Sequence, residues 1–309
     1  MKKALTILST LLIMCFDCNG QNDVGNSRYI FNPMSINPAF AGGNDALHFS
    51  LFYGKKWIGV EGAPKTMAFS LDAPVFNQTL GLGLMIESDD YGVTNENHIK
   101  TNYAYRILMP NSVLSFGLGV DVKITKTTFG DLIALDLDDD IFLQDSKNYI
   151  VPNFSFGVHY TIKNYFIGLS IPKLLDYNFD MANDKYVSEN DFSKYSYLLN
   201  TGYSFGIGKS IYLHPSLLFQ YTSREITEKL QYDFNALVSY NNRIWLGGAY
   251  RNDRSIVTLL QVNPTSQFSV AYSFNFEISK LNRYSNGSHE IILRYLFKYK
   301  VDAPNPLMF

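Results

Sequence analysis

The chain has 309 residues and a formal net charge of −2, so it lacks the basic excess typical of nucleic-acid-binding proteins. Beyond its first twenty residues no apolar run approaches the roughly 20 residues that a transmembrane helix requires, which excludes a helical membrane protein. Aromatic residues nevertheless make up 15% of the chain while the mean hydropathy is only −0.07, a combination typical of outer-membrane β-barrels, in which apolar residues occupy alternate positions.

Residues 1–20 have the features of a secretory signal peptide. Two lysines precede an apolar run over residues 4–16, and small residues follow, which predicts cleavage before Gln21. Lipidation at Cys15 or Cys18 is the alternative, but neither cysteine follows the small residue that normally precedes a lipidated cysteine. Simple cleavage is therefore favoured, and it leaves a mature chain without cysteine.

Residues 21–46 are predicted to form an N-terminal periplasmic or luminal segment. The stretch 28–43 contains two Asn-Pro steps and little alternation, so a strand is not expected there. The segment either leads directly into the barrel or folds into the lumen as a plug, and the space inside a large barrel favours the plug. The candidate plug residues are Asn32, Pro33, Asn37, Pro38, Ala39 and Gly42.

Period-2 patterning predicts about fourteen strands in the rest of the chain, because consecutive side chains of a strand point to opposite faces. In the clearest example, Phe116 and Leu118 alternate with Gly117 and Asp121. The fourteen segments start near Leu47, Thr66, Leu80, Ile99, Leu114, Phe154, Tyr165, Tyr197, Ile211, Leu230, Ile244, Ile256, Phe268 and Ile291. The charged residues expected to face the lumen are Glu87, Lys100, Arg106, Asp121, Lys123, Asp233, Arg251 and Glu277.

The connections between these segments are alternately short and long. The short ones are 73–78, 109–112, 163–164, 206–209, 241–242 and 263–267. The longer ones are 54–65, 88–97, 126–152, 172–194, 223–229 and 278–288, with a tight turn at 252–254 as the exception. Outer-membrane barrels have short periplasmic turns and long external loops, so both termini are expected in the periplasm.

A secreted β-sandwich would also show alternating strands. Its strands are usually five or six residues long, whereas membrane-spanning strands need about nine to eleven, and many of these segments approach the longer value. The prediction is therefore an all-β, antiparallel transmembrane barrel over residues 47–300, followed by a periplasmic tail over 301–309. Phe309 ends the chain as an aromatic residue, but it lies beyond the last strand.

The first long connection is a candidate partner-binding site. Trp57 follows two lysines, including Lys56, and precedes Gly62 and Pro64. A tryptophan beside lysines is typical of an anchor at the lipid interface. Alternatively the loop folds inward and contacts an exported domain, since tryptophan is a favoured interface residue.

The densest charge cluster lies in the longest connection. Asp136, Asp138 and Asp140, together with Asp139, could gather a Ca²⁺ ion, but the glycine and distal glutamate of an EF-hand loop are missing. A solvated acidic loop is the favoured interpretation, and Asp138 and Asp139 remain candidates for contact with a partner protein.

No residue pattern predicts a catalytic or cofactor-binding site. The five histidines show no metal-ligand spacing, and Gly81-x-Gly83 and Gly117-x-Gly119 lie within strands rather than before a helix. No catalytic signature appears, so an enzyme is not expected and no cofactor is predicted.

Several ordered motifs resemble the PorP/SprF family, which comprises outer-membrane proteins of the type IX secretion system in Bacteroidota. They are Asn-Pro at 32–33, Asn-Pro-Ala-Phe-Ala-Gly at 37–42, Lys-Trp-Ile-Gly at 56–59, Gly-Ala-Pro-Lys-Thr at 62–66, Ser-Leu-Asp-Ala-Pro at 70–74, Gly-Leu-Gly at 81–83, Asp-Asp-Tyr-Gly at 89–92, Ser-Phe-Gly-Leu-Gly at 115–119 and His-Glu at 289–290. The sequence departs from the family pattern at Lys55-Lys56, where an Arg-Gln-like pair is usual, and in its extended tail.

The resemblance implies a non-enzymatic role in secreting or displaying a surface protein that carries a type IX C-terminal signal domain. Adhesin-like cargo is expected, together with contacts to other type IX components or to periplasmic anchor proteins. Strand number and a polar lumen, taken alone, also allow an outer-membrane transport barrel for small solutes.

Overall fold

The structure is a computed structural model that describes residues 27–44, 46–128, 146–180, 183–189, 191–224 and 227–297. The predicted signal peptide, the acidic cluster at 136–140 and the predicted C-terminal tail therefore lie outside the described residues. Among the residues described, no helix has the length and apolar character needed to cross a bilayer.

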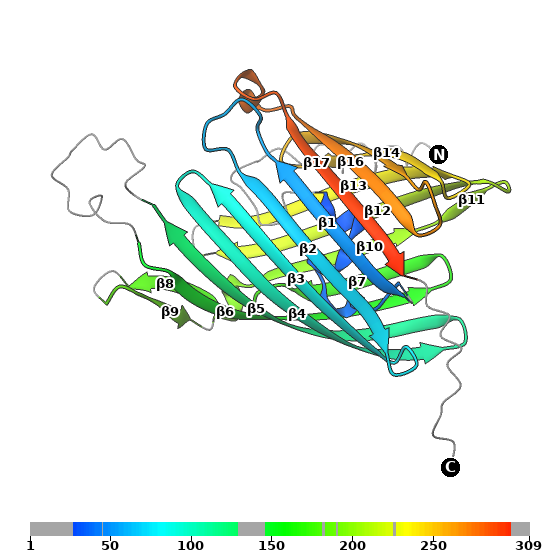
Figure 1. Ribbon diagram of the computed structural model, residues 1–309, viewed down its shortest axis with the longest axis horizontal. Helices are drawn as coiled ribbons and strands as arrows, with labels where there is room; N and C mark the ends of the chain where they lie inside the picture. Colours follow the sequence, from blue (N-terminus) through cyan, green and yellow to red (C-terminus); the bar gives the residue numbers. More distant parts are fainter. Residues whose placement is uncertain are drawn as a thin grey trace, which may run out of the picture.

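Fourteen antiparallel strands close into a barrel (Figure 1). They are β1 (Leu47–Lys55), β2 (Lys65–Val75), β3 (Leu80–Tyr91), β4 (Thr94–Met109), β5 (Ser112–Thr127), β6 (Tyr149–Ile162), β7 (Tyr165–Ile171), β10 (Ser196–Tyr203), β12 (Ile211–Arg224), β13 (Thr227–Tyr240), β14 (Ile244–Arg251), β15 (Ser255–Val262), β16 (Phe268–Glu277) and β17 (Ser288–Phe297). The seam joins β1 to β17, from Leu47 opposite Phe297 to Lys55 opposite His289. The predicted barrel and strand number are confirmed.

Within the described ranges, three further strands lie outside this ring of fourteen. The short strand β11 (Phe205–Ile207) continues the line of β10 along β12. The strands β8 (Asp176–Asp180) and β9 (Lys185–Glu189) form a separate hairpin that projects beside β6 (Figure 1). The sequence pattern predicted only a loop over 172–194, so this hairpin was missed.

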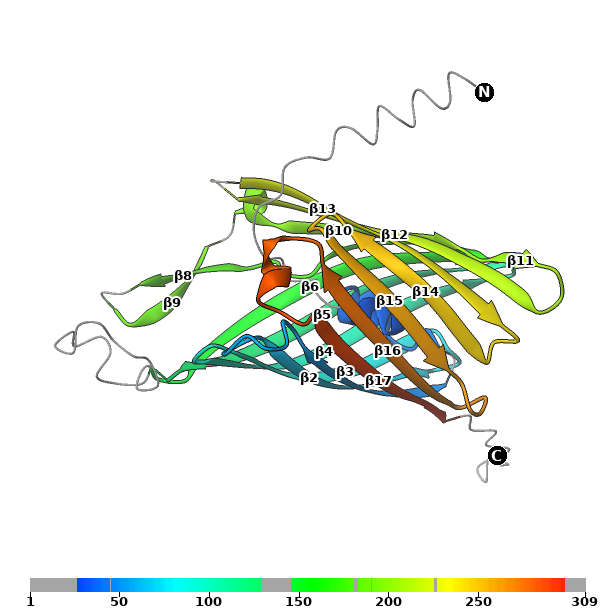
Figure 2. The ribbon, with the colours of Figure 1, turned by 90° about the horizontal axis from the view of Figure 1, so that it is seen from above.

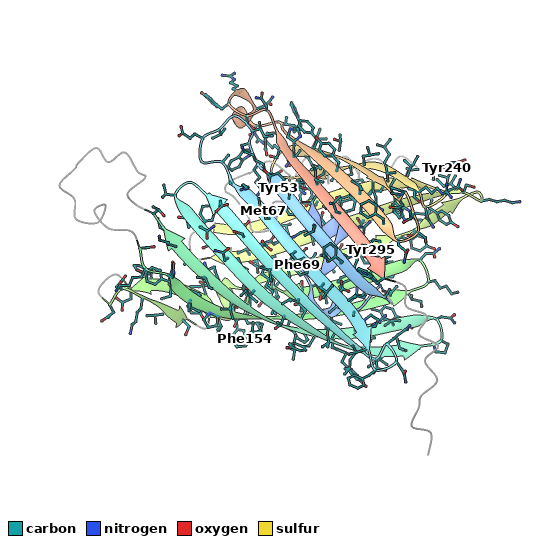
Figure 3. The ribbon with its side chains drawn as sticks, viewed as in Figure 1. Tyr53, Met67, Phe69, Phe154, Tyr240 and Tyr295 are labelled. Atoms are coloured by element: carbon teal, nitrogen blue, oxygen red, sulfur yellow. The ribbon has the colours of Figure 1, made fainter. Side chains whose placement is uncertain are left out.

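The side-chain pattern of the strands is that of a membrane barrel, with apolar residues outside and small or polar residues inside. In β15, Ile256 and Leu260 are more than 40% exposed, whereas Val257 and Leu259 are buried in the lumen. In β5, Phe116 and Leu118 are exposed, as predicted. Figure 3 shows exposed aromatic and apolar side chains, such as those of Tyr53 and Met67, around the outside of the wall. A water-exposed surface of this composition would be unfavourable, so the outside is matched to lipid.

The two ends of the barrel differ in their connections. We call the end with the connections 76–79, 110–111, 163–164, 208–210, 241–243 and 263–267 the turn end, and the opposite end the loop end. The loop end carries the long connections 56–64, 128–148, 172–195 and 278–287, and the last of these contains the helical turn η6 (Lys280–Arg283).

Two of the long connections that the sequence predicted are short. The predicted 88–97 connection is only 92–93, because β3 runs to Tyr91 and β4 begins at Thr94. The predicted 223–229 connection is likewise reduced to 225–226. The strands extend beyond the segments with apolar alternation: β4 and β5 have 16 residues each, about 50 Å of strand, while the apolar band of such barrels is about 25 Å tall.

Candidate functional site: the lumen and the loop end

The lumen contains residues 27–43, which we call the luminal segment. It forms one helical turn, α2 (Arg28–Phe31), and two 3₁₀ turns, η1 (Pro33–Ser35) and η2 (Pro38–Phe40). The dark-blue segment lies inside the barrel in both views (Figure 1, Figure 2). Each of the three buried apolar clusters of the described residues contains at least one member of this segment: Phe31, Tyr29 with Ile36, and Met34 with Ala41.

The luminal segment begins near the loop end. The Ser27 amide donates to the Glu290 carboxylate at 3.0 Å, and Arg251 Nη2 donates to Ser27 Oγ at 3.0 Å. Arg251 is fully buried and also donates through Nε to Asp233 at 3.1 Å. Because Arg251 ends β14 and Glu290 lies near the start of β17, both anchors lie toward the loop end.

Helix α2 joins two opposite walls of the barrel. The Tyr29 hydroxyl donates to Asp233 on β13 at 3.1 Å, and the Arg28 guanidinium pairs with Glu87 on β3 at 2.8 Å. In the closed order of fourteen strands, β3 and β13 are equally far apart in both directions. One buried hydrogen bond and one buried ion pair thus tie α2 to opposite walls. Together they fix the orientation of α2 in the lumen.

The predicted plug residues all lie in the luminal segment. Asn32 donates to Ser70 Oγ at 2.7 Å, and Asn37 Nδ2 is 3.2 Å from the carbonyl oxygens of Val158 and Leu169. Asn37 also caps η2, because its Oδ1 accepts from the Ala39 amide at 2.9 Å. Pro33 and Pro38 occupy the first positions of η1 and η2, where the missing amide hydrogen has no intrahelical role.

The end of the luminal segment lies near the turn end. The Gly42 amide donates to Asp72 at 3.0 Å, and Arg106 donates to the Gly42 carbonyl at 2.8 Å. Gly42 has φ = +70°, and a Cβ there would lie 2.8 Å from the Gly81 Cα, so only glycine fits. The luminal segment therefore spans the lumen from the loop end toward the turn end.

Two cavities lined by described residues lie at opposite ends of the barrel, and they share no lining residue. The loop-end cavity has a volume of about 360 Å³. Its wall charges pair with one another: His98 with Asp121 at 2.9 Å, and Lys123 with Glu96 at 2.9 Å. The turn-end cavity has a volume of about 420 Å³ and is described further below.

Most of the charged residues expected in the lumen are found there. Lys100, Asp121 and Lys123 line the loop-end cavity, and Glu87 lines it as well. Arg106, Asp233 and Arg251 are buried. The roles of Ser27, Arg28 and Tyr29 were not predicted from the sequence. The available signal was a basic residue and a tyrosine directly before the apolar pair Ile30-Phe31.

The first loop, 56–64, is hydrogen-bonded to two other connections of the loop end, 92–93 and 278–287. The Ile58 amide donates to the Gly287 carbonyl at 2.8 Å, and the Gly92 amide donates to the Gly62 carbonyl at 2.8 Å. The Lys56 amide donates to the Pro64 carbonyl, which closes the loop. Burial lowers the pKa of the Lys56 ammonium, and the nearby Glu290 opposes that effect.

Trp57 is half-buried within this loop network. Its amide donates to Ser288 Oγ at 3.1 Å, and its side chain lies close to the Glu277 carboxylate. Lys56, Trp57, Gly62 and Pro64 thus lie together at the loop end, whereas Asp138 and Asp139 lie outside the described residues. Among the residues described, no cluster of His, Cys, Asp and Glu side chains could hold a metal ion.

The β8–β9 hairpin is fastened to the wall at the start of β6. Tyr149, Phe179 and Tyr186 form an edge-to-face aromatic cluster with ring centroids 5.1–5.4 Å apart. Asp184 accepts hydrogen bonds from Lys147 and Tyr149. These two donors hold the pKa of the Asp184 carboxyl below its usual range.

The family profile described as "type IX secretion system membrane protein PorP/SprF" matches residues 18–295. This chain belongs to the PorP/SprF family. The match includes the luminal segment and all of the barrel except the last two residues of β17. No curated protein matches the sequence significantly.

Among solved structures, the PorP/SprF chain is similar in fold to outer-membrane barrels. The toluene transporter TbuX of Ralstonia pickettii is 9% identical with a TM-score of 0.50, covering 85% of this chain and 92% of that one. The outer membrane protein Omp33 of Acinetobacter baumannii is 8% identical with a TM-score of 0.48, covering 82% and 99%. At this identity the likeness concerns the fold alone.

Proposed function

We propose that this PorP/SprF protein is a non-enzymatic outer-membrane barrel that assists secretion or surface attachment of an adhesin-like protein bound at its loop end. The proposal rests on the luminal segment, together with membership of a family of type IX secretion membrane proteins. A barrel whose lumen is crossed by a segment bound to opposite walls is unsuited to open diffusion. Its binding surface is then expected at its ends. This supports a binding role over a pore.

We infer that the loop end faces the cell exterior and the turn end faces the periplasm. The unequal connections support this orientation, because outer-membrane barrels have short periplasmic turns and longer external loops. In this orientation the described chain begins near the external mouth, at Ser27, and ends at the periplasmic side, at Phe297. The expectation that both termini are periplasmic stays a prediction, because the two ends of the chain lie outside the described residues.

The loop end offers apolar surface beyond the lipid belt. Phe179 and Val187 on the β8–β9 hairpin are more than 40% exposed, Phe192 is 70% exposed, and Tyr284 is 74% exposed. Side chains of this kind are enriched at protein interfaces. Together with the loop containing Trp57, they support a docking face for an exported protein.

Deleting the hairpin tests this proposal. A variant in which residues 176–189 are replaced by a short Gly-Ser linker should reach the outer membrane at normal levels, but it should lose its co-purifying partner and leave that partner missing from the cell surface. Replacing the turn 263–267 with a linker of equal length is the matched control and should preserve display. Normal display without the hairpin, and also without the entire protein, would contradict the proposal.

Transport of small solutes is the second candidate, supported by the polar loop-end cavity and by a fold shared with TbuX. Planar-bilayer recordings discriminate the two. A steady, solute-selective conductance of the intact protein would favour transport, whereas a closed barrel that opens only after deletion of residues 21–43 would favour the binding role.

A further inference from the structure

The turn-end cavity is lined by cationic and neutral hydrogen-bonding groups. Arg243 and Arg294 contribute guanidinium groups, five side chains contribute amides, and three contribute hydroxyls. No Asp or Glu lines this cavity. The loop-end cavity, by contrast, is lined by five carboxylates as well as by basic groups. Only the turn-end cavity therefore has an uncompensated positive charge.

Arg294 has an unused donor at this cavity. Its Nη1 donates to the Phe31 carbonyl at 3.0 Å, and its guanidinium lies 5.7 Å from the centroid of the Phe31 ring. Its Nε is buried and has no acceptor among the described residues. A buried donor without an acceptor costs free energy, and an anion near the guanidinium would offset part of that cost.

His48 connects the same cavity to the other end of the luminal segment. It lines the cavity, and its Nδ1 donates to Asp72 at 2.7 Å. Asp72 in turn accepts from the Gly42 amide at 3.0 Å. Of the lining residues, Arg294 thus holds the luminal segment directly at Phe31, and His48 acts on it through Asp72 at Gly42.

We propose that the turn-end cavity is a binding site for a peptide carboxylate, and that an occupied site holds the luminal segment more firmly. Arginine forks match the geometry of a carboxylate, and side-chain amides pair with peptide groups. The strand residues His48 and Gln261 that line the cavity are buried inside the barrel rather than facing lipid, so a peptide is favoured over a lipid headgroup. This inference is independent of the proposed role of the loop end.

Binding to the purified, detergent-solubilised barrel tests the site. The probe is an acetylated tetrapeptide with a free C-terminal carboxylate, compared with the same peptide amidated and with inorganic phosphate. We expect saturable binding of the free-acid peptide that weakens with added salt, and at least about tenfold weaker binding of the amidated peptide and of phosphate.

Arg243→Gln should weaken binding of the free-acid peptide about tenfold or more, since one charged hydrogen-bond partner is lost. Arg254→Gln is the matched control, because Arg254 occupies the same third position of a three-residue turn at the opposite end. Bound peptide should also slow hydrogen exchange of residues 28–43 in the wild type. Binding that does not depend on the carboxylate, equal affinity of phosphate, or an unchanged affinity of Arg243→Gln would each overturn the proposal.

Discussion

Arg28 and Tyr29 are adjacent in the chain, yet their side chains bind carboxylates on opposite walls of the barrel, Glu87 on β3 and Asp233 on β13. One helical turn therefore acts as a brace across the full width of the lumen. Because each contact is buried, loss of either partner removes an interaction that water does not readily replace.

Tyr29→Phe is expected to loosen α2 from the β13 wall. The change removes the hydrogen bonds of the hydroxyl to Asp233 and Asn235 and leaves those groups buried, at a cost of about 1–3 kcal/mol. Hydrogen exchange of the α2 amides should accelerate about tenfold. Tyr53→Phe, at an exposed lipid-facing position, is the control and should leave this exchange unchanged.

Gly117→Ala is expected to displace η2 from the wall. An added Cβ at Gly117 would lie 2.1 Å from the Ala39 nitrogen, a distance that requires the segment to move. Planar-bilayer conductance should rise while the barrel stays folded. Gly206→Ala serves as the control, because its Cβ would meet its nearest neighbour at 3.4 Å, an ordinary contact. If both variants conduct equally, close packing of η2 does not seal the lumen.

Arg251→Ala is expected to cost about 3–5 kcal/mol of stability, because it leaves the buried Asp233 without its cationic partner. The urea midpoint of barrel unfolding in lipid vesicles should fall accordingly. The double variant Arg251→Met with Asp233→Leu removes both charges and should recover most of the loss. A double variant as unstable as the single one would show that packing, rather than the charge, sets the cost.

Asp184→Asn is expected to loosen the β8–β9 hairpin from β6 at neutral pH. The pKa of Asp184 is depressed in the folded protein. The stabilisation that its carboxylate gives to the hairpin is therefore present above the usual aspartate pKa of about 4, and it is lost as the pH falls through the lower folded value. Hydrogen exchange of residues 176–189 should differ between wild type and variant at pH 6 and converge below the folded pKa. A difference that persists in acid would place the effect elsewhere, for example in the aromatic cluster.

The membrane-spanning part of the fold could be predicted from sequence because lipid and lumen impose opposite demands on alternate residues. Phe116 and Gly117 are examples, since one faces lipid and the other contacts η2. Beyond the bilayer this constraint ends. Residues 94–97 are polar on both faces, yet they pair along β3 and β5, so β4 begins earlier than alternation indicated.

The luminal contacts could be predicted only in part. Two Asn-Pro steps excluded a strand, but no local pattern specifies that Asn37 reaches the carbonyls of Val158 and Leu169. The turn-end cavity was missed for the same reason. His48, Arg243 and Arg294 are distant in sequence and meet only after the seam between β1 and β17 has closed.

The luminal segment bears on the order in which the barrel closes and its lumen fills. The segment precedes β1, it runs from the loop end to the turn end, and it contacts strands from β2 to β17 on all sides. If the wall closed first, this peptide would have to enter the lumen afterwards through one end of the barrel. We therefore expect the final β1–β17 pairing to form around this peptide. Strand pairing and filling of the lumen would then be completed together.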